Sequence, residues 1–592
     1  MNFTRVFDIL SYQQQKYPEK EALNTYERGR WVSYSIEEVQ RRVDVLSYWL
    51  HQNGWVKGDK IAFVPKMGLP EWMMLDFACQ QLGVIVVPIH PTATREEFQF
   101  ILSETACKTC VVADTALFYK MSLFFERQFS TISLYHLRSD EEGYFPGFHR
   151  KKITEAEREV VNDLKARIQP EDMATILYTS GTSGEPKGVM LTHFNLVSAI
   201  KSVIPLLPIS YKDRVISFLP FSHIFERATT YTYIVFGVSI YFVQNRENLQ
   251  TDFQSVKPVM FTTVPRVLEK MYDLLKEEGL SRNAVKRLLI KWAIQIGKRY
   301  QETNRFRPGY EIKLAMVRLL VYRKWKSRLG GKIKYIIVGA AALSPDIARL
   351  FSAAGIMVRS GYGMTETSPF ISANRFEPGM NRFDTVGMPV AGMELIIHEP
   401  NDKGEGEIWV KGPNVMQGYY QQPERTREVL SDDGWLKTGD VGLMVDKRFL
   451  RITGRKKDIF KTSAGKYIAP ESLQDYFKQS VFIEHCLVIG FQRPFVTGII
   501  VPNFSWLEKW CKKEKIHWTA PQFMVHNIRV IEKFEEEVNH LNEKLPNYQT
   551  MRKFFLCHED WSIETGEYSA SYKLIRHKLM EQHSREIEKM YQ

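Results

Sequence analysis

The sequence has few cysteines, and its 592 residues include only six. So few thiols in so long a chain do not form a disulfide framework. Cys107 and Cys110 form a single C-x-x-C, without the second pair or the nearby histidines that a structural zinc site needs. We therefore expect a reduced, cytoplasmic protein.

Long apolar runs are also lacking. A long uncharged run covers residues 228–243, fewer than the roughly 20 needed to cross a bilayer, and Gly237 interrupts it. Residues 1–15 carry charged and polar groups and lack the apolar segment of a signal peptide. We expect a buried helix followed by a buried strand at 238–243, and no integral membrane protein.

Acidic residues are scarce in one part of the chain. Between Arg282 and Arg328 there are fourteen Lys or Arg and two acids, within a formal net charge of +12 for the whole chain. Apolar residues recur at helical intervals through this segment, which predicts two basic amphipathic helices. They are Leu288, Leu289, Trp292, Ile296, Leu314, Val317, Leu320 and Val321.

Two interpretations of this basic segment fit the sequence. It is either the solvated face of helices that pack on a core, or a surface that makes peripheral contact with anionic lipid on the inner face of a membrane, with Trp292 and Trp325 at the interface. Nucleic acid is not an expected partner, because no recognised binding module accompanies the charge.

Apolar strands alternate with amphipathic helical segments through most of the chain. Strands are predicted at 60–64, 83–89, 109–113, 259–262 and 333–338. This alternation predicts an α/β protein with layered, largely parallel sheets. A β-rich subdomain is predicted at about 383–453, where short strands follow turn signals. The predicted organisation is a large N-terminal domain, 1–453, and a small mobile α/β domain, 454–592.

A loop suited to phosphate follows the apolar residues 174–177. Residues 178–188 read Y-T-S-G-T-S-G-E-P-K-G, which is not a Walker A loop because proline precedes the lysine. Glycines permit close backbone approach, amide groups can surround phosphate oxygens, and Lys187 adds positive charge. The candidate nucleotide-binding residues are Thr179, Ser180, Gly181, Thr182, Ser183, Gly184 and Lys187.

This segment resembles the signature of the adenylate-forming superfamily, which includes acyl-CoA synthetases, adenylation domains and luciferases. The usual form is [YF]-T-S-G-T-T-G-x-P-K-G, and Ser183 keeps the hydroxyl of the threonine that it replaces. Residues 361–367, G-Y-G-M-T-E-T, look like the second signature. The resemblance implies that Tyr362, with Gly363, contacts adenine and that Thr365 bonds the α-phosphate. It also implies that Glu366 is the Mg²⁺ ligand, a carboxylate that suits a hard cation.

Further motifs resemble the same family toward the C-terminus. Residues 435–440, W-L-K-T-G-D, resemble the third signature, with Asp440 as acceptor for the ribose hydroxyls. Residues 454–461, G-R-K-K-D-I-F-K, match the inter-domain hinge. There the resemblance implies that Arg455 reaches the ribose, that Lys457 is the pivot, and that Lys461 faces the site during thioester formation.

The catalytic lysine is assigned from a looser match. Residues 566–573, G-E-Y-S-A-S-Y-K, stand where relatives read G-E-L-T-P-T-L-K. The resemblance implies that Lys573 bridges the substrate carboxylate and the α-phosphate. Lys578 is the weaker competitor for this role.

Other segments resemble the long-chain fatty acyl-CoA synthetases. Residues 219–227, L-P-F-S-H-I-F-E-R, and residues 257–270 match, and the resemblance implies that His223 lines the acyl pocket beside the carboxylate. Residues 339–345, G-A-A-A-L-S-P, begin at Gly339, a further nucleotide-site candidate. Ala340 and Ala342 depart from the commoner G-G-A-P-L-S-P. These two departures affect the shape of the site wall and therefore the preferred length of the acyl chain.

The resemblance, from about residue 17 to 578, implies an AMP-forming long-chain fatty acid–CoA ligase that uses ATP, Mg²⁺ and CoA. The carboxylate attacks the α-phosphorus and expels pyrophosphate, and the CoA thiol then displaces AMP from the acyl-adenylate. The alternatives are a ligase for medium-chain or aromatic acids, an enzyme that loads a carrier protein, and a non-catalytic lipid-binding relative.

Overall fold

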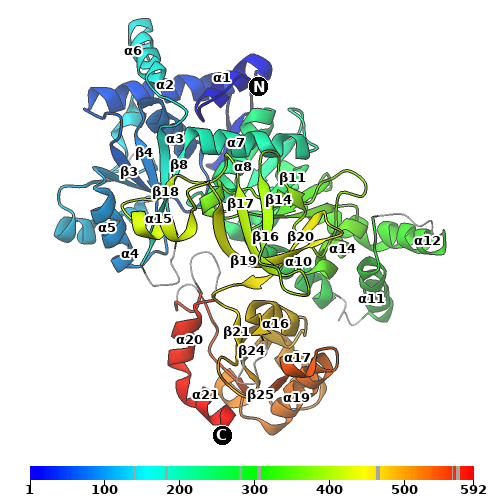
Figure 1. The fold of residues 1–592 in the computed structure, drawn as a ribbon. Coiled ribbons are helices and arrows are strands. Elements are labelled where there is room, and N and C mark those ends of the chain that lie inside the picture. The colour runs from blue at the N-terminus through cyan, green and yellow to red at the C-terminus, as the bar shows by residue number, and fades with distance from the viewer. Residues whose placement is uncertain are drawn as a thin grey trace. The chain divides into compact units, whose positions relative to one another are not determined.

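The computed structural model describes residues 1–138, 141–179, 185–278, 283–302, 308–461, 467–562, 565–568 and 574–592. The chain divides into two compact units. The first comprises Met1–Ile396, Val410–Leu436 and Met444–Arg451, and the second Ile397–Trp409, Lys437–Leu443 and Ile452–Gln592. Each unit is described by itself below (Figure 1).

The first unit contains a seven-stranded sheet in which parallel strands are flanked by antiparallel ones. Strands β7, β4, β3, β5 and β6 pair in parallel, β8 pairs antiparallel with β7, and β18 pairs antiparallel with β8. The order is β18 (Gly418–Tyr419), β8 (Lys187–Thr192), β7 (Met173–Thr179), β4 (Ile85–Pro88), β3 (Lys60–Val64), β5 (Thr109–Val112) and β6 (Ser133–His136).

A nine-stranded sheet forms the other half of the first unit. Its inner strands, from β13 to β1, are all parallel neighbours, while β2, β14 and β15 are antiparallel at the edges. The order is β15 (Met388–Pro389), β14 (Ser372–Ala373), β13 (Met357–Tyr362), β12 (Tyr335–Val338), β11 (Met260–Thr263), β9 (Arg214–Ser217), β10 (Ser239–Phe242), β1 (Leu23–Glu27) and β2 (Arg30–Tyr34).

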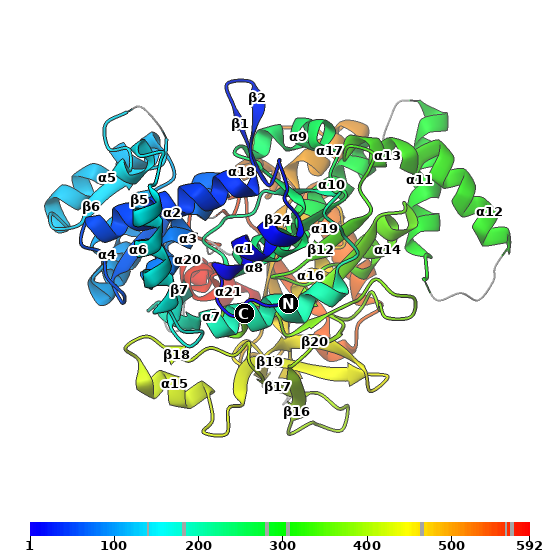
Figure 2. The same cartoon turned by 90° about the horizontal axis from the view of Figure 1, so that it is seen from above.

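Helices cover and separate these sheets (Figure 2). Helix α3 contacts β4 of one sheet and β1 of the other, and nearly all its residues are buried, including the polar Asp76, Gln80 and Gln81. The helices of this unit are α1 (Asp8–Lys16), α2 (Ile36–Gln52), α3 (Pro70–Leu82), α4 (Arg95–Thr105), α5 (Thr115–Gln128), α6 (Glu155–Ala166), α7 (His193–Val203), α8 (Ile224–Phe236), α9 (Leu249–Val256), α10 (Pro265–Glu278), α11 (Ala284–Lys298), α12 (Pro308–Val317), α13 (Arg323–Arg328), α14 (Pro345–Ala353) and α15 (Pro423–Val429).

Short 3₁₀ turns and one π-helical turn complete the helical segments. The π turn, η4 (Arg318–Tyr322), connects α12 to α13. The 3₁₀ turns are η1 (Pro146–His149), η2 (Ile204–Leu206), η3 (Arg246–Asn248), η5 (Thr365–Thr367) and η6 (Asn547–Gln549).

The β-rich region forms a four-stranded sheet in the order β16 (Glu394–His398), β17 (Gly406–Lys411), β19 (Leu436–Val445) and β20 (Phe449–Arg455). The part of the second unit that follows β20 is mixed α/β. A three-stranded sheet of β23 (Ile483–Ile489), β24 (Val496–Pro502) and β25 (Met551–Leu556) packs with helices, and β21 (Phe460–Lys461) pairs with β22 (Tyr467–Ile468). The helices are α16 (Pro470–Phe477), α17 (Phe504–Lys513), α18 (Pro521–Met524), α19 (Ile528–Asn542), α20 (Arg576–Gln582) and α21 (Ser584–Tyr591).

The predicted layered α/β fold class is confirmed. The expected strand at 60–64 is β3, and the expected buried helix and strand around Gly237 are α8 and β10. Among the residues that the structure describes, no helix is both long and apolar enough to cross a membrane.

Candidate active site

The phosphate loop connects two antiparallel strands of the seven-stranded sheet. Thr179 at the end of β7 pairs with Lys187 at the start of β8, so the two ends of the loop lie side by side. Ser180, Gly181, Thr182, Ser183 and Gly184 lie outside the described residues. The structure therefore defines the base of the loop and the position of its lysine.

Tyr419 links the lysine of this loop to the second motif. It lies on β18, opposite Val189 of β8, and the Nζ of Lys187 lies 4.8 Å from the centroid of its ring. Its hydroxyl donates a hydrogen bond of 2.9 Å to Oε1 of Glu366. Burial and the neighbouring Glu366 carboxylate raise the pKa of Tyr419, so the phenol stays a neutral donor. No sequence motif indicates this residue, because it lies far from both motifs along the chain.

Glu366 lies in the short turn η5, which begins at Thr365, just after β13 ends at Tyr362. The backbone amide of Met416 donates to its carbonyl oxygen over 2.8 Å, and the residue is largely buried. The Tyr419 bond engages one carboxylate oxygen, and a carboxylate has acceptor capacity beyond one bond. A buried carboxylate held in this way fits a Mg²⁺ ligand.

Gly363 permits the tight turn before Glu366. A Cβ atom at this position would lie only 1.4 Å from the carbonyl oxygen of Pro369, so any side chain would displace the backbone. The glycine of this motif is thus required by close approach of the backbone to itself.

Helix α8 begins after His223 and is attached to both sheets by the next charged residues of the same motif. The Nη1 of Arg227 donates to Thr175 Oγ1 on β7 over 2.9 Å, and its Nε donates to Asp76 Oδ2 on α3 over 3.0 Å. Glu226 faces the nine-stranded sheet instead. The Glu-Arg pair therefore fixes the start of α8, and with it His223, between the sheets.

Glu226 is fully buried and accepts hydrogen bonds from two hydroxyls. Ser217 Oγ on β9 donates over 2.5 Å, and Thr262 Oγ1 on β11 donates over 3.0 Å. Burial raises the pKa of Glu226 to about 7, although both hydroxyls oppose the shift. A carboxyl group that titrates near neutrality thus lies three residues from His223.

The ring of His223 lies beside that of His90, with the two ring centroids 5.1 Å apart. Two residues further along, the ring centroid of Phe225 lies 6.4 Å from that of Phe370. A Cβ atom at Gly339 would meet the Phe225 ring at 3.0 Å, so this glycine keeps the loop close to α8. Phe225 stands inside the quoted motif, but the sequence did not indicate its contact with Gly339.

Ala340 adopts a backbone conformation that favours glycine. Its φ is +69°, in the left-handed region, at a position where the resembling sequences have glycine. The departure noted in the sequence is therefore accommodated with local strain, on the order of 1 kcal/mol.

The two residues predicted to bind the ribose, Asp440 and Arg455, pair with each other within the second unit. The Nε of Arg455 lies 3.0 Å from Oδ1 of Asp440, which is buried, and the amide of Asp440 donates to Thr438 Oγ1. The carbonyl of Arg455 accepts the amides of Asp458 and Ile459, forming a turn around Lys457.

The remaining lysines are only partly described. Lys461 ends β21, but its side chain lies outside the described residues, as does Lys573. The competitor, Lys578, donates to the carbonyl of Thr565 and lies 3.6 Å from the carboxylate of Glu567. Its contacts within the motif segment are structural, and the assignment of Lys573 stays a prediction.

The prediction of which apolar residues of the basic segment face the core is partly wrong. Leu288 is 71% exposed and Leu320 46%, whereas Ile296, Leu314, Val317 and Val321 are buried as expected for a packed face. Trp325, expected to be available at a membrane interface, is 8% exposed and packs against Tyr322 in the core. Trp292 is partly buried against the same core.

Comparisons with known proteins agree with these motifs. Residues 10–420 match the family model described as AMP-binding enzyme, and residues 457–592 match that described as AMP-binding enzyme C-terminal domain. The chain is 30% identical to long chain acyl-CoA synthetase 7, peroxisomal, from Arabidopsis thaliana, over 95% of this chain and 81% of that protein. It is 31% identical to long-chain-fatty-acid–CoA ligase 5 from Rattus norvegicus, over 95% and 84%.

Solved structures share the fold. The adenylation domain of a carboxylate reductase from Mycobacterium chelonae has a TM-score of 0.73 at 20% identity, covering 99% of this chain and 91% of that one. The o-succinylbenzoate CoA synthetase of Bacillus subtilis has a TM-score of 0.67 at 20% identity, covering 96% and 97%. Since a family model matches most of its length, this chain belongs to the family of AMP-binding enzymes.

Proposed function

We propose that this protein is an ATP-dependent long-chain fatty acid–CoA ligase that forms an acyl-adenylate and releases AMP and pyrophosphate. The observation that carries the proposal is the contact of Tyr419 with both Lys187 and Glu366, which joins the phosphate loop to the metal candidate. The names of the relatives, which match over most of the chain, support the long-chain substrate.

In the first step the fatty acid carboxylate attacks the α-phosphorus of ATP and pyrophosphate leaves. Both reactants are anions, so positive groups at the phosphates lower the barrier. Lys187 and the loop amides bind phosphate oxygens, Thr365 bonds the α-phosphate, and Glu366 holds Mg²⁺. The metal, when bound, neutralises charge that develops on the phosphates. Tyr419 is a positioning residue that orients the Glu366 carboxylate.

In the second step the CoA thiol attacks the acyl carbon, loses its proton, and AMP leaves. Tyr362 and Gly363 contact adenine, and Asp440 and Arg455 bind the ribose. The C-terminal domain, 454–592, turns about Lys457 between the steps, withdrawing Lys573 and presenting Lys461. A hinge-type change of this kind suits a reaction with two different nucleophiles.

The acyl chain enters beside His223 and the loop at Gly339. The apolar Phe225 supports this placement, since it follows His223 by two residues, its ring packs against Gly339, and its ring centroid lies 6.4 Å from that of Phe370. The Glu226–Arg227 anchor holds this wall rigid, which a site that measures an apolar chain requires.

The test is ATP–pyrophosphate exchange followed by thioester formation, with octanoate, laurate, palmitate, oleate and benzoate. We expect exchange with palmitate and oleate and transfer to CoA. Exchange only with benzoate or octanoate would show that the substrate is an aromatic or medium-chain acid. Transfer only to a holo carrier protein would show that the acceptor is not CoA. Absence of exchange with every acid would favour the non-catalytic alternative. Glu366→Gln is the negative control.

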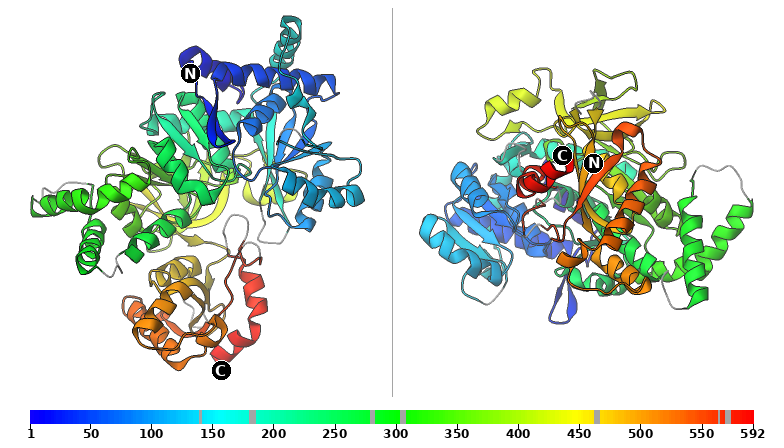
Figure 3. Two further views of the ribbon diagram at one scale, coloured as in Figure 1. Left: turned by 180° about the vertical axis from the view of Figure 1, so that it is seen from behind. Right: turned by 90° about the horizontal axis from the view of Figure 1, so that it is seen from below.

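We also propose peripheral contact with anionic lipid on the inner face of a membrane, by a protein that otherwise works in the cytoplasm. The contact surface, here the α11–α12 face, consists of exposed apolar side chains: Val285, Leu288, Ile312, Met316, Leu319 and Leu320. Exposed cations accompany them, namely Lys286, Arg287, Lys291, Lys313, Arg323 and Lys324. Helices α11 and α12 lie at one edge of the first unit (Figure 3).

The apolar side chains on this face contribute hydrophobic binding to the membrane, in addition to the electrostatic attraction of the cations. Val285 and Leu288 are three residues apart on α11, and Ile312, Met316 and Leu319 follow helical spacing along α12 and η4. Each set therefore shares one side of its helix. Each cation near an anionic surface contributes about 1 kcal/mol, and inserted apolar side chains add binding that salt does not screen.

Sedimentation with phosphatidylserine vesicles tests this contact. We expect binding at low salt that falls, but persists in part, at high salt. Leu288→Ser with Ile312→Ser and Leu319→Ser should abolish the salt-resistant part, whereas Leu123→Ser, equally exposed on α5, should not. Without binding by the unaltered protein at low salt, the solvated-face interpretation holds.

A further inference from the structure

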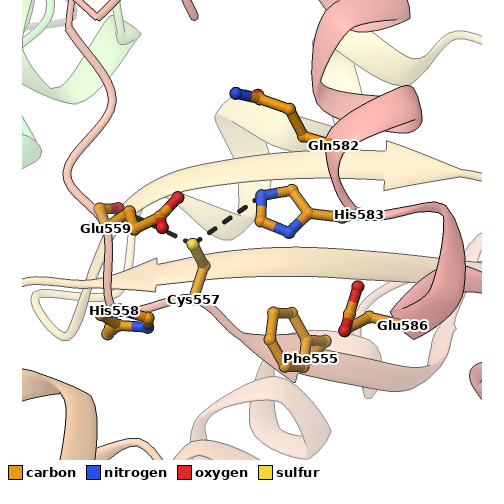
Figure 4. Close-up of a pocket in the computed structure, with 7 residues that line it drawn as sticks. All are labelled: Phe555, Cys557, His558, Glu559, Gln582, His583 and Glu586. Atoms are coloured by element: carbon orange, nitrogen blue, oxygen red, sulfur yellow. Dashed lines mark hydrogen bonds between the residues drawn. The ribbon is translucent and has the colours of Figure 1, made fainter.

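Three side chains with metal-binding atoms, none of them part of the motifs discussed above, meet in the second unit. They are Cys557, Glu559 and His583, and one ligand atom from each lies within 4.8 Å of the other two. The Sγ of Cys557 lies 3.9 Å from Nε2 of His583. In Figure 4 the sulfur lies between Glu559 and the imidazole ring.

The fold holds two of the three ligands in place. The amide of Cys557 donates to the carbonyl of Ile500 over 2.8 Å, which extends the pairing of β25 with β24 beyond its last residue. His583 lies where α20 ends and α21 begins, and its amide donates to Leu579. Cys557 is buried, and Phe555 lies against the His583 ring.

The sulfur–nitrogen separation is close to what zinc needs. With Zn–S of about 2.3 Å and Zn–N of about 2.05 Å, tetrahedral geometry places the two ligand atoms roughly 3.6 Å apart. The observed 3.9 Å therefore requires only a small adjustment. Glu559 is exposed, so its carboxylate can move to complete a third bond.

A cavity beside the three ligands has room for an ion and its water. Its volume is about 350 Å³, and its lining includes Gln582 and Glu586 as well as the three ligands. Glu586 stands three residues after His583, in the first turn of α21. It brings a second carboxylate to the cavity wall, which could accept a hydrogen bond from a metal-bound water.

The chemistry of the ligand set selects the class of metal. A thiolate with an imidazole and a carboxylate suits Zn²⁺ and related divalent transition metals, whereas Mg²⁺ prefers oxygen ligands alone.

We propose that Cys557, Glu559 and His583 bind one zinc-like divalent cation, with water as the fourth ligand. On binding, the thiol releases its proton to solvent as the metal–sulfur bond forms, and no redox change occurs. Cys557 and Glu559 precede, and His583 follows, the segment that carries the catalytic-lysine motif. The ion therefore clamps the two ends of that segment together and stabilises the C-terminal unit.

Cobalt(II) titration of the full-length, chelator-treated protein tests the site. We expect a thiolate-to-cobalt charge-transfer band that saturates at one equivalent and is displaced by Zn²⁺. Cys557→Ser should remove the band, and His583→Gln should weaken binding by more than about a hundredfold, beyond the loss of an outer-shell partner. Cys511→Ser and His577→Gln, in the same unit, are matched controls that should keep the band.

Thermal unfolding gives a second readout that does not depend on activity. Zn²⁺ should raise the Tm of the unaltered protein and of both controls but not of Cys557→Ser. Should Cys557→Ser fail to fold, Glu559→Gln carries the test, because its side chain is exposed and its loss leaves the core intact. No cobalt band in the unaltered protein, or a band that persists in Cys557→Ser, would overturn the proposal.

Discussion

The hydroxyl of Tyr419 donates a hydrogen bond to the carboxylate of Glu366, and the ring of the same tyrosine lies beneath the ammonium group of Lys187. Tyr419→Phe removes the first contact and keeps the second. A hydrogen bond to a charged group contributes about 1.5–3 kcal/mol, so we expect a roughly ten- to hundredfold weaker apparent affinity for Mg²⁺–ATP. Initial-rate kinetics over Mg²⁺ and ATP concentrations measures it.

Two further variants bracket that result. Tyr419→Leu also removes the ring from Lys187 and should lower activity further, by about tenfold or less. Tyr420→Phe alters the neighbouring tyrosine and should behave like the unaltered protein. An unchanged Mg²⁺ dependence in Tyr419→Phe would show that the hydroxyl does not position the carboxylate.

Glu366→Gln tests the metal ligand itself. Loss of a metal-bound carboxylate should cost several kcal/mol of transition-state stabilisation, roughly a thousandfold or more in adenylation rate. Single-turnover formation of acyl-adenylate measures the rate, and Glu424→Gln, an exposed carboxylate on α15, is the control. Near-normal activity of Glu366→Gln would mean that another residue holds Mg²⁺.

Lys573→Ala should separate the two half-reactions. If the lysine neutralises charge only during adenylation, acyl-adenylate formation collapses, while thioester formation from supplied acyl-adenylate largely survives. Lys578→Ala should retain both half-reactions, since its side chain bonds Thr565 and Glu567 within its own segment. Equal loss of both steps in Lys573→Ala would remove the assignment.

The hinge prediction concerns the turn around Lys457. Proline there fixes φ at a residue that must change conformation, so Lys457→Pro should keep adenylation and lose thioester formation. Lys457→Ala leaves the backbone free and should support both steps. Normal thioester formation in the proline variant would place the pivot elsewhere.

Glu226 predicts a pH dependence of stability. Its folded pKa is about 7, above the ordinary value of 4.5, so between these values the folded protein keeps a proton that the unfolded chain releases. Stability from this group is therefore fully present below pH 4.5 and is lost as pH rises through 7, by up to about 3 kcal/mol.

Glu226→Gln removes this dependence. We expect the difference in apparent unfolding free energy between the variant and the unaltered protein to change between pH 5 and 8, in favour of the variant at the higher pH. Urea unfolding at four pH values measures it. Contributions from other groups, such as His193 with its pKa lowered by burial to about 3, cancel in the difference. Parallel curves would contradict the shift.

The sequence by itself determined the fold class, several strands and the motif positions. Strand β3 matches its predicted bounds, and α8 and β10 lie where the uncharged run placed them. These features depend on local patterns: periodicity selects helix or strand, and Gly363 and Lys187 belong to short motifs of fixed spacing. Such signals are contained in a few consecutive residues.

Only the tertiary structure decided which distant residues meet. Tyr419 stands 53 positions from Glu366, and the proposed zinc site brings Cys557 next to His583, so no local pattern indicates either contact. The same holds for burial. Helical spacing placed Leu288 and Leu320 with the buried residues of their helices, and the membrane-contact interpretation placed Trp325 at the surface, yet both leucines are exposed and Trp325 is buried. Periodicity shows that a helix has two faces, but the neighbours that pack against it determine which face is covered.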